Sequence, residues 1–181
     1  LGRVRDLSGV KFDKVFSAED IKFDDSTVSA FFLLHVFHHI KNPERFLEEA
    51  QRCLKPGGKI IMIEPSNTMF SRFIRKKLCL EHYDETASWK LKGSKPMSDA
   101  NLALPWIVFV RDYEIFKKKF PNLSVICYEP HTPFRFLLSG GVTYKSLIPK
   151  SFIPLVKLSE QILSPLNRLL GMHVTIEIEK I

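Results

Sequence analysis

The first half of the chain combines short apolar runs with a helical pattern. Residues Ala30–Leu34 are continuously apolar, which is typical of a β-strand buried on both faces. Asn42 and Pro43 suit the N-cap and the first position of a helix. Apolar residues then recur at helical spacing, at Phe46, Leu47, Ala50, Cys53 and Leu54. A turn is predicted at Pro56–Gly58, followed by a second buried strand at Ile60–Ile63.

A strand, a helix and a second strand in succession predict a right-handed βαβ unit. The two strands should therefore be adjacent and parallel, with Phe46, Ala50 and Cys53 packed on one face of the sheet. Beyond this unit, residues 66–110 show no regular pattern. The next expected elements are a helix at Arg111–Phe120 and a strand at Leu123–Glu129. In that helix the residues expected to face inward are Ile115, Phe116 and Phe120.

The C-terminal part predicts a long helical segment and a final strand. The helical pattern runs from Ser151 to Leu170, with a kink expected at Pro165. After it, Val174, Ile176 and Ile178 alternate with polar residues, which is typical of a half-exposed antiparallel strand. The predicted fold class is α/β.

Composition and charge narrow the class of protein. The 181 residues, 45% of them apolar, suffice for one domain or a large part of a bigger one. The 27 Lys and Arg against 20 Asp and Glu are spread along the chain, so no nucleic-acid partner is expected. No apolar run reaches the roughly 18 residues of a membrane span, and the N-terminal residues have no signal-peptide pattern. The three scattered cysteines argue against a disulfide framework or zinc cluster, so a cytoplasmic location is expected.

Four short motifs carry a family resemblance. They are Ala18–Phe23, His35–Ile40, Asn42–Leu47 and Leu54–Lys59. In this order and spacing they resemble the second half of a class I S-adenosylmethionine-dependent methyltransferase of the small-molecule branch. The resemblance implies a Rossmann-like, mostly parallel sheet with an antiparallel last strand. It also implies S-adenosylmethionine as cofactor and a small-molecule acceptor, lipid-like or glycosylated.

The chain departs from the family at its N-terminal side. The family opens with a strand and a Gly-rich turn, then a second strand with an acidic end, and these residues contain neither. We therefore expect a partial methyltransferase domain whose N-terminal βαβ part is missing and which is inactive on its own. Its expected parts are a cofactor-side core (1–65), a lid or insertion (66–110), and a C-terminal helix, strand, helical insertion and final strand (111–181). Ser17 stands where the family usually has Asp.

Candidate site residues follow from the strand ends, where open α/β sheets bind their ligands. By resemblance, the residues expected to contact the cofactor are Ser17, Ala18, Glu19, Leu34 and His35. His35 and His39 are the candidate catalytic bases, because imidazole has a suitable pKa. His38 and His39 could as easily pack or cap the following turn. The substrate-side candidates are Glu64, Asn67, Asn101 and Trp106. No metal site is expected.

Several alternatives stay open at this level. The apolar positions between Leu155 and Leu169 could line an acceptor pocket, form a dimer or membrane-surface patch, or simply cap the sheet. The missing N-terminal part would leave an exposed sheet edge at Ala30–Leu34, which favours a homo-oligomer. In function, the alternatives are a non-catalytic partner or scaffold protein and a different Rossmann-like enzyme that uses NAD.

Overall fold

A four-stranded mixed sheet organises the protein. The computed structural model describes residues 16–78, 81–91, 100–140 and 145–181. The strands are β1 (Val28–Leu34), β2 (Leu54–Pro65), β3 (Leu123–His131) and β4 (His173–Lys180), in the spatial order β1-β2-β4-β3. Strands β1 and β2 are parallel, and β4 runs antiparallel to both of its neighbours, β2 and β3. This confirms the α/β class with an antiparallel last strand.

The strand register brings one edge of the sheet together. Leu34 at the end of β1 pairs with Ile63 of β2. His173, the first residue of β4, pairs with Pro65 on one side and with His131 on the other. The carboxyl ends of β1, β2 and β3 therefore meet at a single edge, which we call the carboxyl edge.

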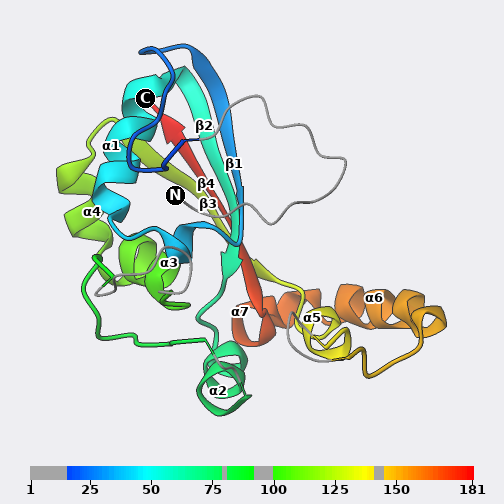
Figure 1. Ribbon diagram of the computed structural model, residues 1–181. Helices are drawn as coiled ribbons and strands as arrows, with labels where there is room; N and C mark the ends of the chain where they lie inside the picture. Colours follow the sequence, from blue (N-terminus) through cyan, green and yellow to red (C-terminus); the bar gives the residue numbers. More distant parts are fainter. Residues whose placement is uncertain (1–15, 79–80, 92–99, 141–144) are drawn as a thin grey trace.

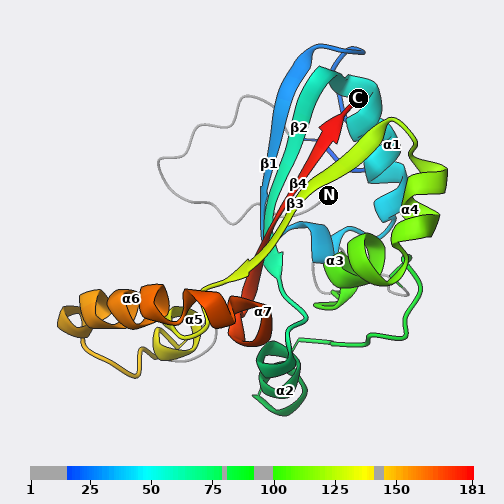
Figure 2. The same cartoon turned by 180° about the vertical axis from the view of Figure 1, so that it is seen from behind.

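Helices pack on one face of the sheet. They are α1 (Pro43–Cys53), α3 (Leu104–Trp106), the π-helical turn η2 (Ile107–Arg111) and α4 (Tyr113–Lys119). Helix α2 (Met69–Leu78) follows β2 and lies beyond the ends of the strands, off this face (Figures 1 and 2). Figures 1 and 2 show α1, α3 and α4 together on one side of the strands. As predicted, Asn42 caps α1, its side chain accepting the Arg45 N–H, and Phe46, Ala50 and Cys53 are buried against β2. Burial of each large apolar side chain contributes about 1.5–3 kcal/mol.

A helical insertion lies between β3 and β4. It consists of α5 (Arg135–Leu138), the 3₁₀ turn η3 (Lys150–Phe152), α6 (Ile153–Ile162), the 3₁₀ turn η4 (Ser164–Leu166) and α7 (Asn167–Leu170). It projects away from the sheet at the carboxyl edge (Figures 1 and 2). The predicted kink is confirmed, because η4, which contains Pro165, separates α6 from α7. Proline interrupts a helix since it has no N–H to donate.

The burial of two strands differs from the sequence prediction. β1 is not buried on both faces: Phe32 is 77% exposed and Leu34 65%. It is the outermost strand, and within the described residues no helix covers this face. Conversely, β4 is a central strand and more buried than predicted, with Ile176 and Ile178 fully covered.

Three local predictions were also wrong. Residues 66–110 are not irregular, because they contain α2, α3 and most of η2. Ile115 is 49% exposed, so α4 turns Phe116 but not Ile115 into the core. The predicted turn Pro56–Gly58 lies inside β2 as a bulge, where the pairing skips from Leu54 to Lys59. Gly57 takes φ +74° there, a conformation that favours glycine.

The isolated 181-residue chain should self-associate through the open edge of β1, because an unpaired apolar edge strand is a template for pairing. Phe32→Lys should shift the chain toward monomer and change its free energy of unfolding by less than about 0.5 kcal/mol, since this side chain packs against little. Light scattering over a concentration series measures the association. A monodisperse wild-type monomer would contradict the prediction.

Candidate functional site

The carboxyl edge gathers five of the six histidines. They are His35 after β1, His38 and His39 in the 3₁₀ turn η1 (Phe37–His39), His131 at the end of β3 and His173 at the start of β4. Ring centroids lie 4.1 Å apart for His38 and His39 and 4.8 Å apart for His35 and His173. The His131 and His173 rings are 6.3 Å apart. The edge is therefore a continuous surface of imidazoles.

Glu64, near the end of β2, is the anion beneath this surface. Its side chain is fully buried. One carboxylate oxygen accepts the backbone N–H groups of Val36, at 2.9 Å, and Phe37, at 2.7 Å. The other lies 2.6 Å from Nδ1 of His38, which is itself buried. A buried carboxylate is stable only when it is satisfied in this way. Glu64 thus holds the turn and the His38 ring in place and does not face solvent.

His35 occupies the exposed side of the same edge. Its backbone has φ +53°, an uncommon conformation for a residue other than glycine, and its N–H donates to the Ile63 carbonyl at 2.9 Å. Burial lowers the pKa of His35, and His38 and Arg75 act in the same direction, whereas Glu64 opposes them. The half-buried imidazole is consequently neutral at pH 7 and able to accept a proton.

His173 closes the edge from the side of β4. It is buried between the His35 ring and the Phe136 ring, whose centroid lies 4.8 Å away. Burial, reinforced by His35 and Arg75, lowers the pKa of His173 to about 3. A neutral His173 adds no positive charge next to His35.

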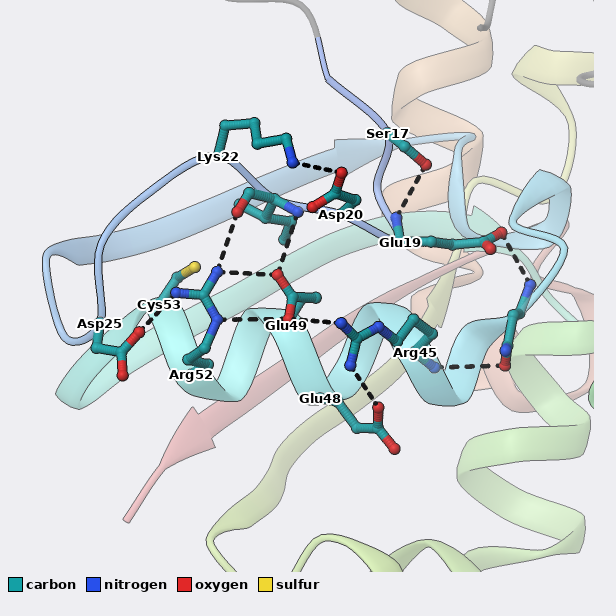
Figure 3. Close-up of polar contacts among 12 residues, drawn as sticks. Ser17, Glu19, Asp20, Lys22, Asp25, Arg45, Glu48, Glu49, Arg52 and Cys53 are labelled. Carbon is teal, nitrogen blue, oxygen red and sulfur yellow. Dashed lines mark hydrogen bonds and ion pairs between the residues drawn. The ribbon is translucent and has the colours of Figure 1, made fainter.

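The predicted cofactor loop lies beside the start of α1 (Figure 3). Ser17 is exposed, and its hydroxyl accepts the Glu19 N–H at 3.2 Å. The Glu19 carboxylate accepts the N–H of Asn42 at 3.1 Å, so it points toward the start of α1. Ala18 packs against the core.

Arg52 and Glu49 of α1 fasten the chain that follows this loop. The Arg52 guanidinium donates to the carbonyls of Ile21 and Phe23, each at 3.0 Å, and pairs with Asp25 at 2.6 Å (Figure 3). Glu49 accepts the Ile21 N–H at 3.2 Å, and its hydrogen bond with Arg52 holds the pKa of Glu49 below its usual range. Sequence reasoning missed this anchor. The available signal was the Glu49–Arg52 spacing of three residues, which places both on one helix face.

The side chains of the predicted substrate-side residues are engaged in contacts within the fold. Asn101 is buried. Its side-chain oxygen accepts the backbone N–H of Asp84 at 3.0 Å and that of Ala103 at 3.1 Å, and so connects the segments that contain these two residues. Asn67 bonds through its amide to Glu85 at 3.3 Å and through its oxygen to the Tyr83 hydroxyl. Trp106 packs against the core cluster.

Asn101 nevertheless lies close to the histidines. Its backbone N–H donates to the His38 carbonyl at 3.0 Å. Asn101 therefore supports the edge from behind, together with Glu64, and neither side chain faces the open side.

A polar pocket of about 410 Å³ adjoins the edge next to His131. Its lining residues are His131, Thr132, Pro133, Arg135, Lys157, Glu160, Gln161, Ser164 and Asn167. The pocket thus lies between the end of β3 and the helical insertion. Among the described residues, no group of three or more His, Cys, Asp or Glu is arranged to hold a metal ion.

Comparison with known proteins shows what the chain is similar to. The methyltransferase domain family matches residues 5–62, the part of the chain that contains β1, the 3₁₀ turn η1 and α1. A structure of an S-adenosylmethionine-dependent methyltransferase from Thermotoga maritima has the same fold, with a TM-score of 0.50 at 16% identity. The chain thus resembles the methyltransferase domain family over residues 5–62 and has a methyltransferase-like fold.

The matches cover only part of each similar protein. The match to the Thermotoga structure covers 92% of this chain and 62% of that one. A methyltransferase from Methanosarcina mazei matches at 13% identity and TM-score 0.49, over 93% of this chain and 66% of that one. An uncharacterized protein of Methanocaldococcus jannaschii is 34% identical over 62 residues, 34% of this chain and 30% of that protein. The chain thus spans less than two thirds of the length of these proteins.

Arg75 of α2 is a second residue that sequence reasoning missed. It lies among basic residues, with Arg72, Lys76 and Lys77, yet it is only 4% exposed. Its guanidinium donates to Ser71 at 3.0 Å and to the Met172 carbonyl at 2.8 Å, just before β4. The signal was Ser71, one helical turn earlier. Arg75 supplies positive charge beneath His35 and His173.

Glu64→Gln should lower the free energy of unfolding of the chain by about 1.5–3 kcal/mol, because charge-assisted hydrogen bonds become neutral ones. Glu177→Gln is the matched control: its side chain is 31% exposed and pairs with Lys59 at 3.6 Å, so the expected cost is at most about 1 kcal/mol. Urea denaturation measures both. Equal losses in the two variants would show that Glu64 does not hold the turn.

Proposed function

We propose that the full-length protein transfers a methyl group from S-adenosylmethionine to a small-molecule acceptor at the carboxyl edge. The observation that carries the proposal is His35: a neutral, half-buried imidazole at the end of β1, supported by the Glu64–His38 pair. Ligands of open α/β sheets bind at such strand ends. The match to the methyltransferase domain family favours methyl transfer as the reaction.

His35 is the proposed general base. When bound, S-adenosylmethionine would supply the methyl group of its sulfonium, and the neutral thioether released is a good leaving group. The protein's part is therefore to align the acceptor and, where the acceptor must lose a proton, to receive it. A ring nitrogen of His35 would take that proton. His38 is held by Glu64 as a positioning residue, and His39, which stacks on His38, is the second candidate base.

The described residues fit one part of the cofactor. Leu34 is 65% exposed beside His35 and suits the apolar methionine chain. Ser17, Ala18 and Glu19 are proposed for the adenine side, on a loop that Arg52 and Glu49 fasten to α1. An exposed Ser17 hydroxyl offers a neutral hydrogen bond there, weaker than one from a carboxylate.

The acceptor's polar group is proposed to lie in the pocket beside His131. Thr132, Gln161 and Ser164 offer hydrogen-bonding groups there, and Lys157 a positive charge. Asn67 and Trp106 remain proposed contacts on the side of α2 and α3. Glu64 and Asn101 are proposed to hold the 3₁₀ turn η1 in place and not to contact the acceptor themselves.

His35→Ala in the full-length protein should reduce methyl transfer by about 10²–10⁴-fold, as expected for loss of a general base, while the dissociation constant for S-adenosylmethionine changes little. The wild-type rate should rise with pH to a plateau, with a midpoint below 6.5, because burial lowers the pKa of His35 and only its neutral form is a base. The assay follows labelled methyl transfer to the small-molecule fraction of a cell extract.

His82→Ala is the matched control for this experiment. His82 is exposed and belongs neither to the strand ends nor to the turn η1, so its removal should leave the rate unchanged. Wild-type activity in His35→Ala would refute the role of His35. Binding of S-adenosylmethionine without any transfer would favour a non-catalytic partner protein.

The 181 residues alone should bind S-adenosylmethionine with a dissociation constant of roughly millimolar or weaker. They contain no Gly-rich turn and no acidic strand end for the ribose, and each lost charge-assisted contact weakens binding by about tenfold or more. Calorimetry of the chain and of the full-length protein, with S-adenosylmethionine and NAD as ligands, measures the difference. Micromolar binding by the chain would contradict this, and full-length protein that binds only NAD would overturn the proposed function.

A further inference from the structure

The segment from residue 145 to 170, which we call the arm, carries a row of exposed apolar side chains. Its large exposed members are Leu147, Phe152, Ile153, Leu155, Leu158, Ile162, Leu166 and Leu169. From Phe152 onward most are spaced by three or four residues, which places them on one side of the α6–α7 helical run. Ile162 is 69% exposed and Leu155 61%, so the core does not use this face.

The charged residues of the arm are mostly cations. It contains four cations, Lys145, Lys150, Lys157 and Arg168, and a single acidic residue, Glu160. Glu160 is only 6% exposed: its carboxylate accepts the N–H groups of Phe134, at 3.0 Å, and Arg135, at 2.8 Å, and pairs with the Arg135 guanidinium. The outward surface of the arm therefore combines apolar side chains with cations and presents no carboxylate of its own.

The arm is also placed to meet an external surface. Figures 1 and 2 show α5, α6 and α7 projecting from the carboxyl edge, away from the sheet and from the helices on its face. α6 has 10 residues, about half the length needed to cross a bilayer. Among the described residues, no helix meets the length and hydropathy of a membrane span. An amphipathic helix of this kind can lie in the plane of an interface.

We propose that the arm binds the surface of an anionic lipid bilayer. The apolar row enters the boundary between headgroups and acyl chains, and the cations contact the negatively charged headgroups. The charge of the arm distinguishes between two possible binding partners, a second copy of the arm and an anionic bilayer. A second copy of the arm would place cations opposite cations with no exposed acid to pair them, whereas an anionic bilayer supplies the missing negative charge.

Vesicle flotation tests the proposal. The chain should bind vesicles of phosphatidylcholine with about 30% phosphatidylserine more tightly than pure phosphatidylcholine vesicles, and less tightly at high salt. The double variant Leu158→Ser, Ile162→Ser should bind the anionic vesicles at least about tenfold more weakly, because two inserted side chains are lost. Lys150→Gln with Arg168→Gln should weaken binding by roughly 30-fold, since each cation near the surface contributes about a factor of five.

Ile115→Ser is the matched control. It removes a side chain that is 49% exposed on α4, away from the arm, and should leave vesicle binding unchanged. Circular dichroism should show all variants folded, because every substituted position is exposed. The proposal is overturned if the chain does not bind anionic vesicles, or if Ile115→Ser weakens binding as much as the arm variants. It is equally overturned if the arm variants abolish self-association in light scattering while vesicles are not bound.

Discussion

The buried carboxylate of Glu64 is the constraint on which the carboxyl edge depends. A fully covered anion must collect donors, and the donors available are the two N–H groups of Val36 and Phe37 and the ring of His38. To deliver them, the chain has to turn back sharply as soon as β1 ends, which explains the left-handed backbone of His35. The position of the His35 ring thus follows from the charge on the neighbouring strand.

The central place of β4 determines what surrounds this edge. Because β4 inserts between β2 and β3, its first residue, His173, pairs with both of them. The insertion that precedes β4 must therefore leave the sheet at the end of β3 and return beside the histidines. Gly171 lies where the chain returns to the sheet. Its carbonyl accepts hydrogen bonds from the hydroxyl groups of Ser66 and Thr68. A Cβ added at Gly171 would lie 2.7 Å from the backbone nitrogen of His131, so a larger residue does not fit there. The edge, the polar pocket and the arm consequently form one continuous region.

Local periodicity predicted the elements whose signals are local. The cap at Asn42, the apolar face of α1 and the parallel pairing of β1 with β2 all depend on residues close together in the sequence. Burial was harder to predict, because it depends on neighbours that the periodicity does not name. The apolar run at Ala30–Leu34 reads as doubly buried, yet Phe32 and Leu34 are exposed since nothing in the described chain covers them.

The sequence predicted where the candidate site lies in the sheet, but not what each side chain does there. The strand-end rule pointed to His35 and Glu64, and the structure places both at the carboxyl edge. The sequence could not show that the Glu64 carboxylate forms its hydrogen bonds with a turn 26–28 residues earlier. The contacts of Arg75 and Arg52 could not be predicted from the sequence either, because both side chains donate to backbone carbonyls. Every residue has a backbone carbonyl, so a hydrogen bond to it does not require a particular residue type at the partner position.

One helix, α6, connects the pocket with the outward face of the arm. Lys157, Glu160 and Gln161 line the pocket from one side of α6, while Leu155, Leu158 and Ile162 are exposed on another. A helix that lies on a bilayer by its apolar side would hold its polar side, and hence the pocket, just above the headgroups. An acceptor with an apolar tail and a polar head could then present its head to the pocket while its tail stays in the lipid. The amphipathic pattern of α6 thereby gives a physical reason for a lipid-like acceptor at a site whose own walls are polar.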